Sequence, residues 1–265
     1  MNMQAIIISV TVIAVLGLIL GIFLGIAAKA FYVKTDPREE QIVEALPGNN
    51  CGGCGYPGCS GLAAAIVKGE AQVGGCPVGG SAVAAKVAAI MGVEAEDQER
   101  MTAFVKCIGD CDKASKDYEY TGEQDCRMAA MLPGGGDKSC AYGCLGYGSC
   151  VSACPFDAIH VVNGIAVVDK DACKACGKCI EACPKKIIEM IPYDAVYVVG
   201  CSSKDKGADV MKKCKAGCIG CSLCKKNCPE DAVEINDLLA HIDQAKCVSC
   251  GTCAEKCPKK VIINH

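Results

Sequence analysis

Residues 218–229 read CIGCSLCKKNCP, and this stretch decides the fold. The same spacing, C-x-x-C-x-x-C-x-x-x-C-P, returns at residues 247–258 and at residues 173–184. An irregular fourth run ends in Cys154-Pro155. We therefore expect small, loop-rich units built around groups of cysteines.

Cysteine supplies 25 of the 265 residues, while the formal net charge is only −3. A disulfide framework is typical of short secreted chains, and this chain is long enough for two or three domains. Zinc sites use separated C-x-x-C pairs, whereas triplets followed by Cys-Pro are the bacterial ferredoxin [4Fe–4S] spacing. The runs therefore predict iron–sulfur clusters, with zinc as the competing interpretation.

The N-terminus predicts a membrane anchor. Residues 5–28 carry no charge, and at about 1.5 Å per residue this run crosses a hydrocarbon core of about 30 Å. A signal peptide normally has a basic start, which residues 1–4 lack. Lys29, Lys34 and Arg38 follow the span, which favours a single-pass protein of the cell (inner) membrane with its bulk on the cytoplasmic side. That compartment is reducing and favours metal thiolates over disulfides.

The chain repeats itself after residue 104. Residues 104–107 (FVKC) resemble residues 198–201 (VVGC), and both lead into cysteine runs. Asn163-Gly164 between apolar segments predicts a hairpin, and residues 232–242 are a weaker match. Alanine-rich segments near residues 61–70 and 81–91 favour helix.

These signals predict an α+β chain with four parts. They are a single N-terminal transmembrane helix (residues 1–34), a small helical [4Fe–4S] domain (35–93), and two tandem bacterial ferredoxin-like units, the first with an N-terminal extension (94–197 and 198–265).

The regular runs predict ligand sets directly. In two-cluster ferredoxins the cysteine before proline binds the other cluster. The predicted sets in the second unit are Cys218, Cys221, Cys224 and Cys257, and Cys247, Cys250, Cys253 and Cys228.

The first unit departs from the pattern because its earlier run lacks the middle cysteine. The same rule predicts one set of Cys173, Cys176, Cys179 and Cys154. The other set is Cys144, Cys150 and Cys183, for which the nearest fourth ligand in sequence is Cys140.

Two further sites are predicted from the remaining cysteines. Glycines surround Cys51, Cys54 and Cys59, which with Cys76 suffice for one cluster or, alternatively, a zinc ion. A sixth cluster between the repeats is predicted from Cys107, Cys126, Cys201 and Cys214, with buried free thiols as the alternative. Cys111 is then left free.

At this point the sequence resembles a known family, the B subunits of Rnf complexes. These complexes are membrane-bound ferredoxin:NAD oxidoreductases that couple electron flow to sodium or proton translocation. The resemblance rests on the N-terminal span, the segment NCGGCGYPGC at residues 50–59, Cys76-Pro77, and the later ferredoxin-type runs. Residues 120–126 (YTGEQDC) and 143–146 (GCLG) resemble the longer, cluster-rich form found in this family.

The resemblance implies an electron-transfer subunit of a translocase with no substrate-converting site of its own. It would accept electrons from reduced ferredoxin and pass them to membrane subunits, while flavin and NAD bind elsewhere in the complex. The expected partners are reduced ferredoxin, the other Rnf subunits and the membrane, and not nucleic acid. The sequence carries no dinucleotide or P-loop fingerprint.

Two alternatives stay open. The chain could serve another membrane reductase, or it could be a zinc-stabilised membrane scaffold. Residues 170–265 contain 16 Lys and Arg residues and 12 Asp and Glu residues, so this part of the chain has a net positive charge. Lysines beside the Cys-Pro turns could steer an acidic ferredoxin or simply be solvated. They are Lys185, Lys186, Lys225, Lys226, Lys259 and Lys260.

Overall fold

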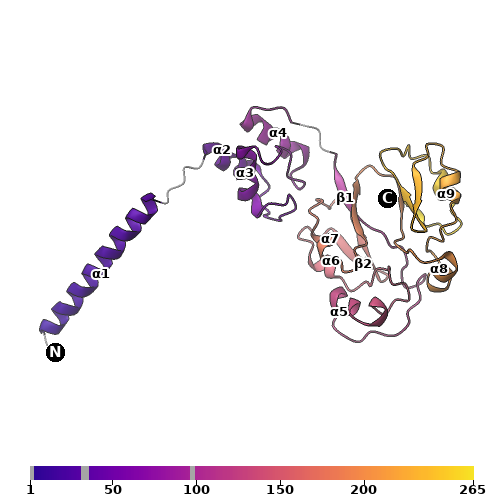
Figure 1. Ribbon diagram of the computed structural model, residues 1–265, viewed down its shortest axis with the longest axis horizontal. Helices are drawn as coiled ribbons and strands as arrows, with labels where there is room; N and C mark the ends of the chain where they lie inside the picture. The colour runs from indigo at the N-terminus through magenta and orange to yellow at the C-terminus, as the bar shows by residue number, and fades with distance from the viewer. Residues whose placement is uncertain (1–2, 31–35, 96–98) are drawn as a thin grey trace.

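The computed structural model describes residues 3–30, 36–95 and 99–265 (Figure 1). The predicted anchor boundary at residues 34 and 35 lies outside them, as do residues 96–98, just after the predicted boundary at residue 93. Helix α1 spans Met3–Ala30. Its window Val10–Ala27 has a mean hydropathy of 2.8 and is not covered by the rest of the protein. By length and composition α1 is able to cross a membrane.

A small helical domain follows, made of α2 (Pro37–Ala45), α3 (Gly58–Lys68) and α4 (Gly80–Met91). The Asp36 side chain caps α2, and Pro37 stands at its first turn. Both alanine-rich segments are helical, and each helix ends at a left-handed glycine, Gly69 or Gly92. The core comprises Ile42, Leu46, Leu62, Ala63, Ile66 and Val87.

The first ferredoxin-like unit is built on two antiparallel strand pairs. Strand β1 (Met101–Val105) pairs with β4 (Ile188–Pro192), so the first and last strands of the unit lie side by side. Between them, β2 (Ile159–Val162) and β3 (Ile165–Val168) form the hairpin predicted from Asn163-Gly164. Both turn residues have positive φ, 47° and 75°, as a two-residue type I′ turn requires. Short helices carry cysteines: α5 (Cys126–Ala130), α6 (Ser149–Ser152) and α7 (Lys178–Ala182), with a 3₁₀ turn η1 at Pro133–Gly135.

The second unit repeats this topology. Strand β5 (Tyr197–Val199) pairs with β8 (Ile262–Asn264), and β6 (Val233–Asn236) pairs with β7 (Leu239–Ile242). Its helices are α8 (Gly207–Lys213), α9 (Leu223–Lys226) and α10 (Thr252–Glu255). The weaker hairpin prediction near residues 232–242 is confirmed by β6 and β7. Because β1 and β5 each pair with the last strand of their own unit, the topology agrees with the repeat read from the sequence.

The two units are joined through backbone and side-chain hydrogen bonds. The amide of Ile108 donates to the carbonyl of Gly200 at 3.1 Å, and Ser202 Oγ donates to the carbonyl of Lys106 at 2.9 Å. A second contact pairs Ala114 with Cys214 as an isolated bridge. These contacts hold cysteines from both repeats around one shared space.

Candidate iron–sulfur centres

The second unit encloses two cavities lined by cysteines. One, of about 350 Å³, is lined by four cysteines from both halves of the unit; the other measures about 330 Å³. The crossover rule predicts these same two groups, and the structure brings the members of each together. They are Cys218, Cys221, Cys224 and Cys257, and Cys228, Cys247, Cys250 and Cys253.

In the first unit the structure corrects one predicted grouping. A cavity of about 330 Å³ is lined by Cys144, Cys150, Cys183 and Cys126, and Cys140 is not among the cysteines around it. Cys126 is the first residue of α5. Its amide donates to Ser149 Oγ at 2.7 Å, and Ser149 Oγ donates to Asp125 Oδ2 at 3.0 Å. Cys126 thus lies in one group with Cys144, Cys150 and Cys183, although the run at residues 144–154 has no middle cysteine.

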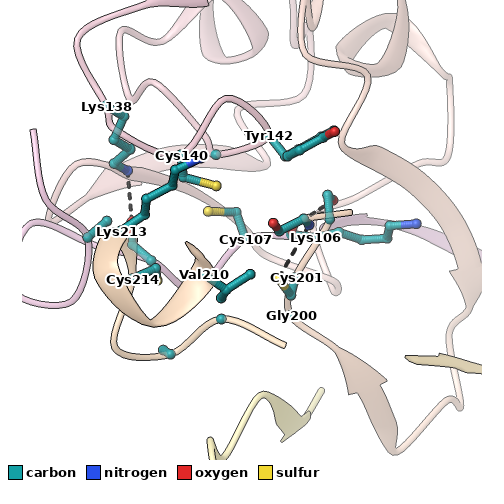
Figure 2. A pocket seen from close by; sticks show the side chains of 17 residues that line it. Lys106, Cys107, Lys138, Cys140, Tyr142, Gly200, Cys201, Val210, Lys213 and Cys214 are labelled. Carbon is teal, nitrogen blue, oxygen red and sulfur yellow. Dashed lines mark hydrogen bonds between the residues drawn. The ribbon is translucent and has the colours of Figure 1, made fainter. Parts of the chain in front are cut away.

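Cys140 lies instead in the cavity between the two units (Figure 2). This cavity, of about 440 Å³, is lined by Cys107, Cys140, Cys201 and Cys214. The set predicted for this site is therefore wrong in one member, because Cys140 lies where Cys126 was expected. The reason is long-range pairing: Ser139 donates its amide to the Ser115 carbonyl at 3.0 Å, and Ser115 donates to the Lys213 carbonyl at 3.0 Å. These bonds draw Cys140 toward the second unit.

The repeat carried a signal for this arrangement. Cys107 corresponds to Cys201, and the Cys140-x-x-x-Cys144 step corresponds to Cys214-x-x-x-Cys218. The inter-unit group is thus two equivalent pairs, one from each repeat. Cys126 has no counterpart in the second repeat, and the first repeat has no cysteine that corresponds to Cys221.

The structure also brings together the other set predicted for the first unit, which is Cys154, Cys173, Cys176 and Cys179. Burial raises the pKa of Cys179 to about 11, and the neighbouring thiols Cys173, Cys176 and Cys154 add to that rise. The amides of Ala103 and Ala175 donate to Cys173 Sγ at 3.4 and 3.5 Å. Such N–H···S bonds are one of the ways in which proteins tune iron–sulfur potentials.

In the N-terminal domain, Cys51 and Cys54 lie on the loop before α3, Cys59 lies in the first turn of α3, and Cys76 precedes α4. Burial raises the pKa of Cys76, with Cys54 and Cys59 adding to the rise. Asn50 Oδ1 accepts from the Cys59 amide at 2.8 Å and fixes the start of α3. The loop reaches the first ferredoxin-like unit, because a β-carbon on Gly53 would lie 2.7 Å from the carbonyl oxygen of Cys176.

These surroundings fit iron–sulfur clusters. In each of the four cavities, cysteines from separate segments of the chain surround one space, and each cavity is lined by four of them. Within the described ranges, no three Cys, His, Asp or Glu side chains converge on a point suited to one metal ion. Cysteines set around a space, rather than around a point, suit a cubane better than a single zinc ion.

The electrostatics of the thiols agree with this fit. Burial raises the pKa of Cys150 to about 12 and that of Cys201 to about 11. Buried thiols of this kind become thiolates when a cationic metal core binds them. Burial also raises the pKa of Cys144 and Cys214, and the nearby charge of Lys138 opposes that rise at both thiols.

Cys111 and the lysines beside the Cys-Pro turns lie in different surroundings. Cys111 is exposed, packs against Gly164, and lies outside the cysteine groups described above. Lys185 is not a free surface lysine, because its Nζ donates to the Ala141 carbonyl at 2.8 Å. Lys186, Lys225, Lys226 and Lys260 are exposed, and Lys259 is half-buried.

Fold and site together define an iron–sulfur protein of the polycluster ferredoxin type. Residues 46–78 match a family described as a putative Fe-S cluster, and residues 137–185 and 217–261 each match a 4Fe-4S dicluster domain. The chain belongs to the family formed by the B subunits of Rnf-type ion-translocating oxidoreductase complexes.

Three relatives support this membership over most of their length. The chain is 48% identical to the B subunit of the Na(+)-translocating ferredoxin:NAD(+) oxidoreductase complex of Acetobacterium woodii, covering 92% of this chain and 73% of the relative. It is 44% identical to the B subunit of the ion-translocating oxidoreductase complex of Methanosarcina acetivorans, covering 90% of each. The B subunit of the proton-translocating ferredoxin:NAD(+) oxidoreductase complex of Clostridium ljungdahlii is 43% identical, covering 92% and 86%.

Proposed function

We propose that this chain is the membrane-anchored electron-transfer subunit of an Rnf complex. It accepts electrons from reduced ferredoxin and relays them to membrane subunits, and the complex couples this flow to NAD reduction and Na⁺ or H⁺ translocation. The observation that carries the proposal is the series of cysteine groups along the chain. Each ferredoxin-like unit holds two groups, a further group lies between the units, and the Gly53 loop sets the N-terminal domain against Cys176.

The chain's own residues would hold six [4Fe–4S] clusters, which supply one-electron redox chemistry when bound. The proposed ligand sets are Cys51, Cys54, Cys59 and Cys76; Cys154, Cys173, Cys176 and Cys179; Cys126, Cys144, Cys150 and Cys183; Cys107, Cys140, Cys201 and Cys214; Cys218, Cys221, Cys224 and Cys257; and Cys228, Cys247, Cys250 and Cys253.

The second ferredoxin-like unit is the proposed docking end for ferredoxin. Cys221 and Cys250 are the two exposed members of the proposed ligand sets, and both belong to this unit. The exposed lysines Lys225, Lys226 and Lys260 lie close by in sequence. Positive charge beside an accessible cluster steers an acidic partner and speeds its association.

The opposite end is the proposed route to the membrane. The N-terminal domain directly follows the segment after α1, and its Gly53 loop meets the first unit at Cys176. Basic residues after the apolar run, Lys29 and Arg38 among them, favour the cytoplasmic side for the folded domains. Electrons would thus run from the C-terminal unit toward the anchor.

The test is the rate at which reduced ferredoxin reduces the intact purified chain, followed by stopped-flow absorbance at low and high salt. Charge reversal at Lys225, Lys226 and Lys260 should slow the low-salt rate and flatten its salt dependence. Lys68→Glu, on an exposed position of the N-terminal domain, is the matched control. Ferredoxin that fails to reduce the intact chain would overturn the proposal. A census of co-purifying subunits separates an Rnf complex from another membrane reductase.

A further inference from the structure

Lys138 is a lysine buried between two cysteine groups. Its relative exposure is 4%. Its Nζ donates to the carbonyls of Gly109 and Cys144, both at 2.7 Å, and of Gly164 at 3.4 Å. An ammonium group has three N–H donors and no acceptor, so three carbonyls match its charged form. These carbonyls belong to three separate segments of the first unit.

The position of Lys138 connects two of the cavities. It lines the inter-unit cavity together with Cys140 and Cys214, and Figure 2 shows its side chain alongside that cavity. The carbonyl that it binds on Cys144 belongs to a residue lining the neighbouring cavity of the first unit. One cation therefore borders two of the proposed cluster sites.

The charge of Lys138 has no carboxylate partner within ion-pair distance among the residues that the structure describes. The other lysines around it are paired: Lys106 with Glu189 and Lys213 with Asp205, both at 2.8 Å. A buried charge without a counter-charge is costly. Carbonyl dipoles offset part of that cost, and an anionic group nearby would offset the rest. Four thiolates outweigh the positive charge of an iron–sulfur core, so a cluster bound in either cavity supplies this counter-charge.

We propose that Lys138 is a positioning residue that raises the reduction potentials of the two clusters it borders. This inference rests on the proposed function. Reduction adds one electron, here from ferredoxin or a chemical reductant, to a cluster that is already anionic. The hydrogen bonds to three carbonyls hold the Lys138 side chain in place between the two groups. A fixed cation in a poorly screened site favours the more negative, reduced form of both neighbours.

The consequence is that two clusters in the relay would have higher reduction potentials than the clusters on either side of them. The inter-unit group and the Cys126, Cys144, Cys150 and Cys183 group would hold electrons more readily than their neighbours. Electrons arriving from the second unit would collect at the junction of the two repeats. A single buried lysine would thereby favour passage from one unit into the other.

The test is an EPR-monitored redox titration of the intact, cluster-loaded chain. Lys138→Gln removes the charge but keeps an amide able to donate to the carbonyls, and Lys138→Arg keeps the charge. Lys213→Gln is the matched control, because Lys213 lines the same cavity but is paired and about one third exposed. Iron and sulfide are counted in every variant.

With full iron content, the Lys138→Gln chain should show two clusters shifted to lower potential, and Lys138→Arg should keep the original values. The shift in Lys213→Gln should be smaller, because solvent screens its site. Unchanged potentials, or equal shifts in Lys138→Gln and Lys213→Gln, would overturn the proposal. So would loss of iron in both Lys138 variants, which would make the lysine only a structural cross-link. The proposed function is tested separately in the wild-type chain: it stands after any of these results if the wild-type chain is loaded with iron and ferredoxin reduces it.

Discussion

A β-carbon on Gly53 would lie 2.7 Å from the carbonyl oxygen of Cys176 and 3.0 Å from its Cα atom. Gly53 belongs to the cysteine loop of the N-terminal domain, and Cys176 to the first ferredoxin-like unit. Only a residue without a side chain permits this approach, because the opposing atoms are backbone and have no rotamer to change. Cys51 also lies near enough to influence the thiol of Cys176. The contact brings two proposed clusters of different domains together.

Gly53→Ala should therefore separate these domains without removing any ligand. We expect full iron content but reduction of the N-terminal cluster slowed at least several-fold, since electron tunnelling weakens steeply with distance. Freeze-quench EPR after mixing with reduced ferredoxin measures this rate. Gly55→Ala is the control: Gly55 has a φ of +84°, so the change strains the same loop, but its β-carbon meets nothing within 4 Å. Equal rates in Gly53→Ala and wild type would contradict the proposed route.

Cys126 shares a group with Cys144, whereas Cys140 belongs to another group. Two double variants that include Cys144 should therefore lose different amounts of iron. Cys126→Ala with Cys144→Ala removes two ligands of one group and should cost up to about four irons. Cys140→Ala with Cys144→Ala damages two groups and should cost up to about eight. Iron and sulfide analysis after anaerobic purification distinguishes them. If the pair with Cys140 lost no more iron than the pair with Cys126, the grouping found in the structure would be wrong.

Ser149 positions Cys126 and should matter to that group alone. Ser149→Ala removes the hydrogen bonds to the Cys126 amide and to Asp125, and we expect a loss of about 1 kcal/mol in stability. The same change should speed the release of about four irons to a chelator. Ser152→Ala, on the exposed face of the same helix α6, is the control. A chelation rate equal to that of Ser152→Ala would argue against this positioning role.

Cys111 is expected to be the reactive thiol of the native, cluster-loaded protein. It is exposed and lies outside the proposed ligand sets, whereas the exposed Cys221 and Cys250 would be bound to iron. Maleimide should therefore modify the loaded chain once, and Cys111→Ser should abolish that labelling. Mass spectrometry locates the adduct, and labelling of Cys221 or Cys250 in the loaded chain would count against their assignment as ligands.

Much of the site could be predicted from local spacing. The regular runs fix which cysteines share a loop, and the crossover rule then pairs Cys228 and Cys257 with the opposite triplets. Asn163-Gly164 predicts its hairpin because both residues tolerate positive φ. These inferences depend on residues a few positions apart, where the chain itself limits the geometry.

The remainder depends on contacts between distant segments. Cys140 is near Cys144 in sequence, but the bonds through Ser115 and Ser139 carry it to the second unit. Nothing local marks Lys138 as buried or Gly53 as a contact, because each is defined by carbonyls from other segments. Comparing the two repeats position by position is the one sequence signal that leads to the inter-unit group.

The most direct test of the six-cluster relay is the content of iron, sulfide and zinc in the intact chain after anaerobic purification. Six cubanes predict about 24 irons with an equal amount of sulfide and negligible zinc. About 20 irons would contradict the inter-unit site formed by Cys107, Cys140, Cys201 and Cys214. Zinc without sulfide would contradict the electron-transfer function itself.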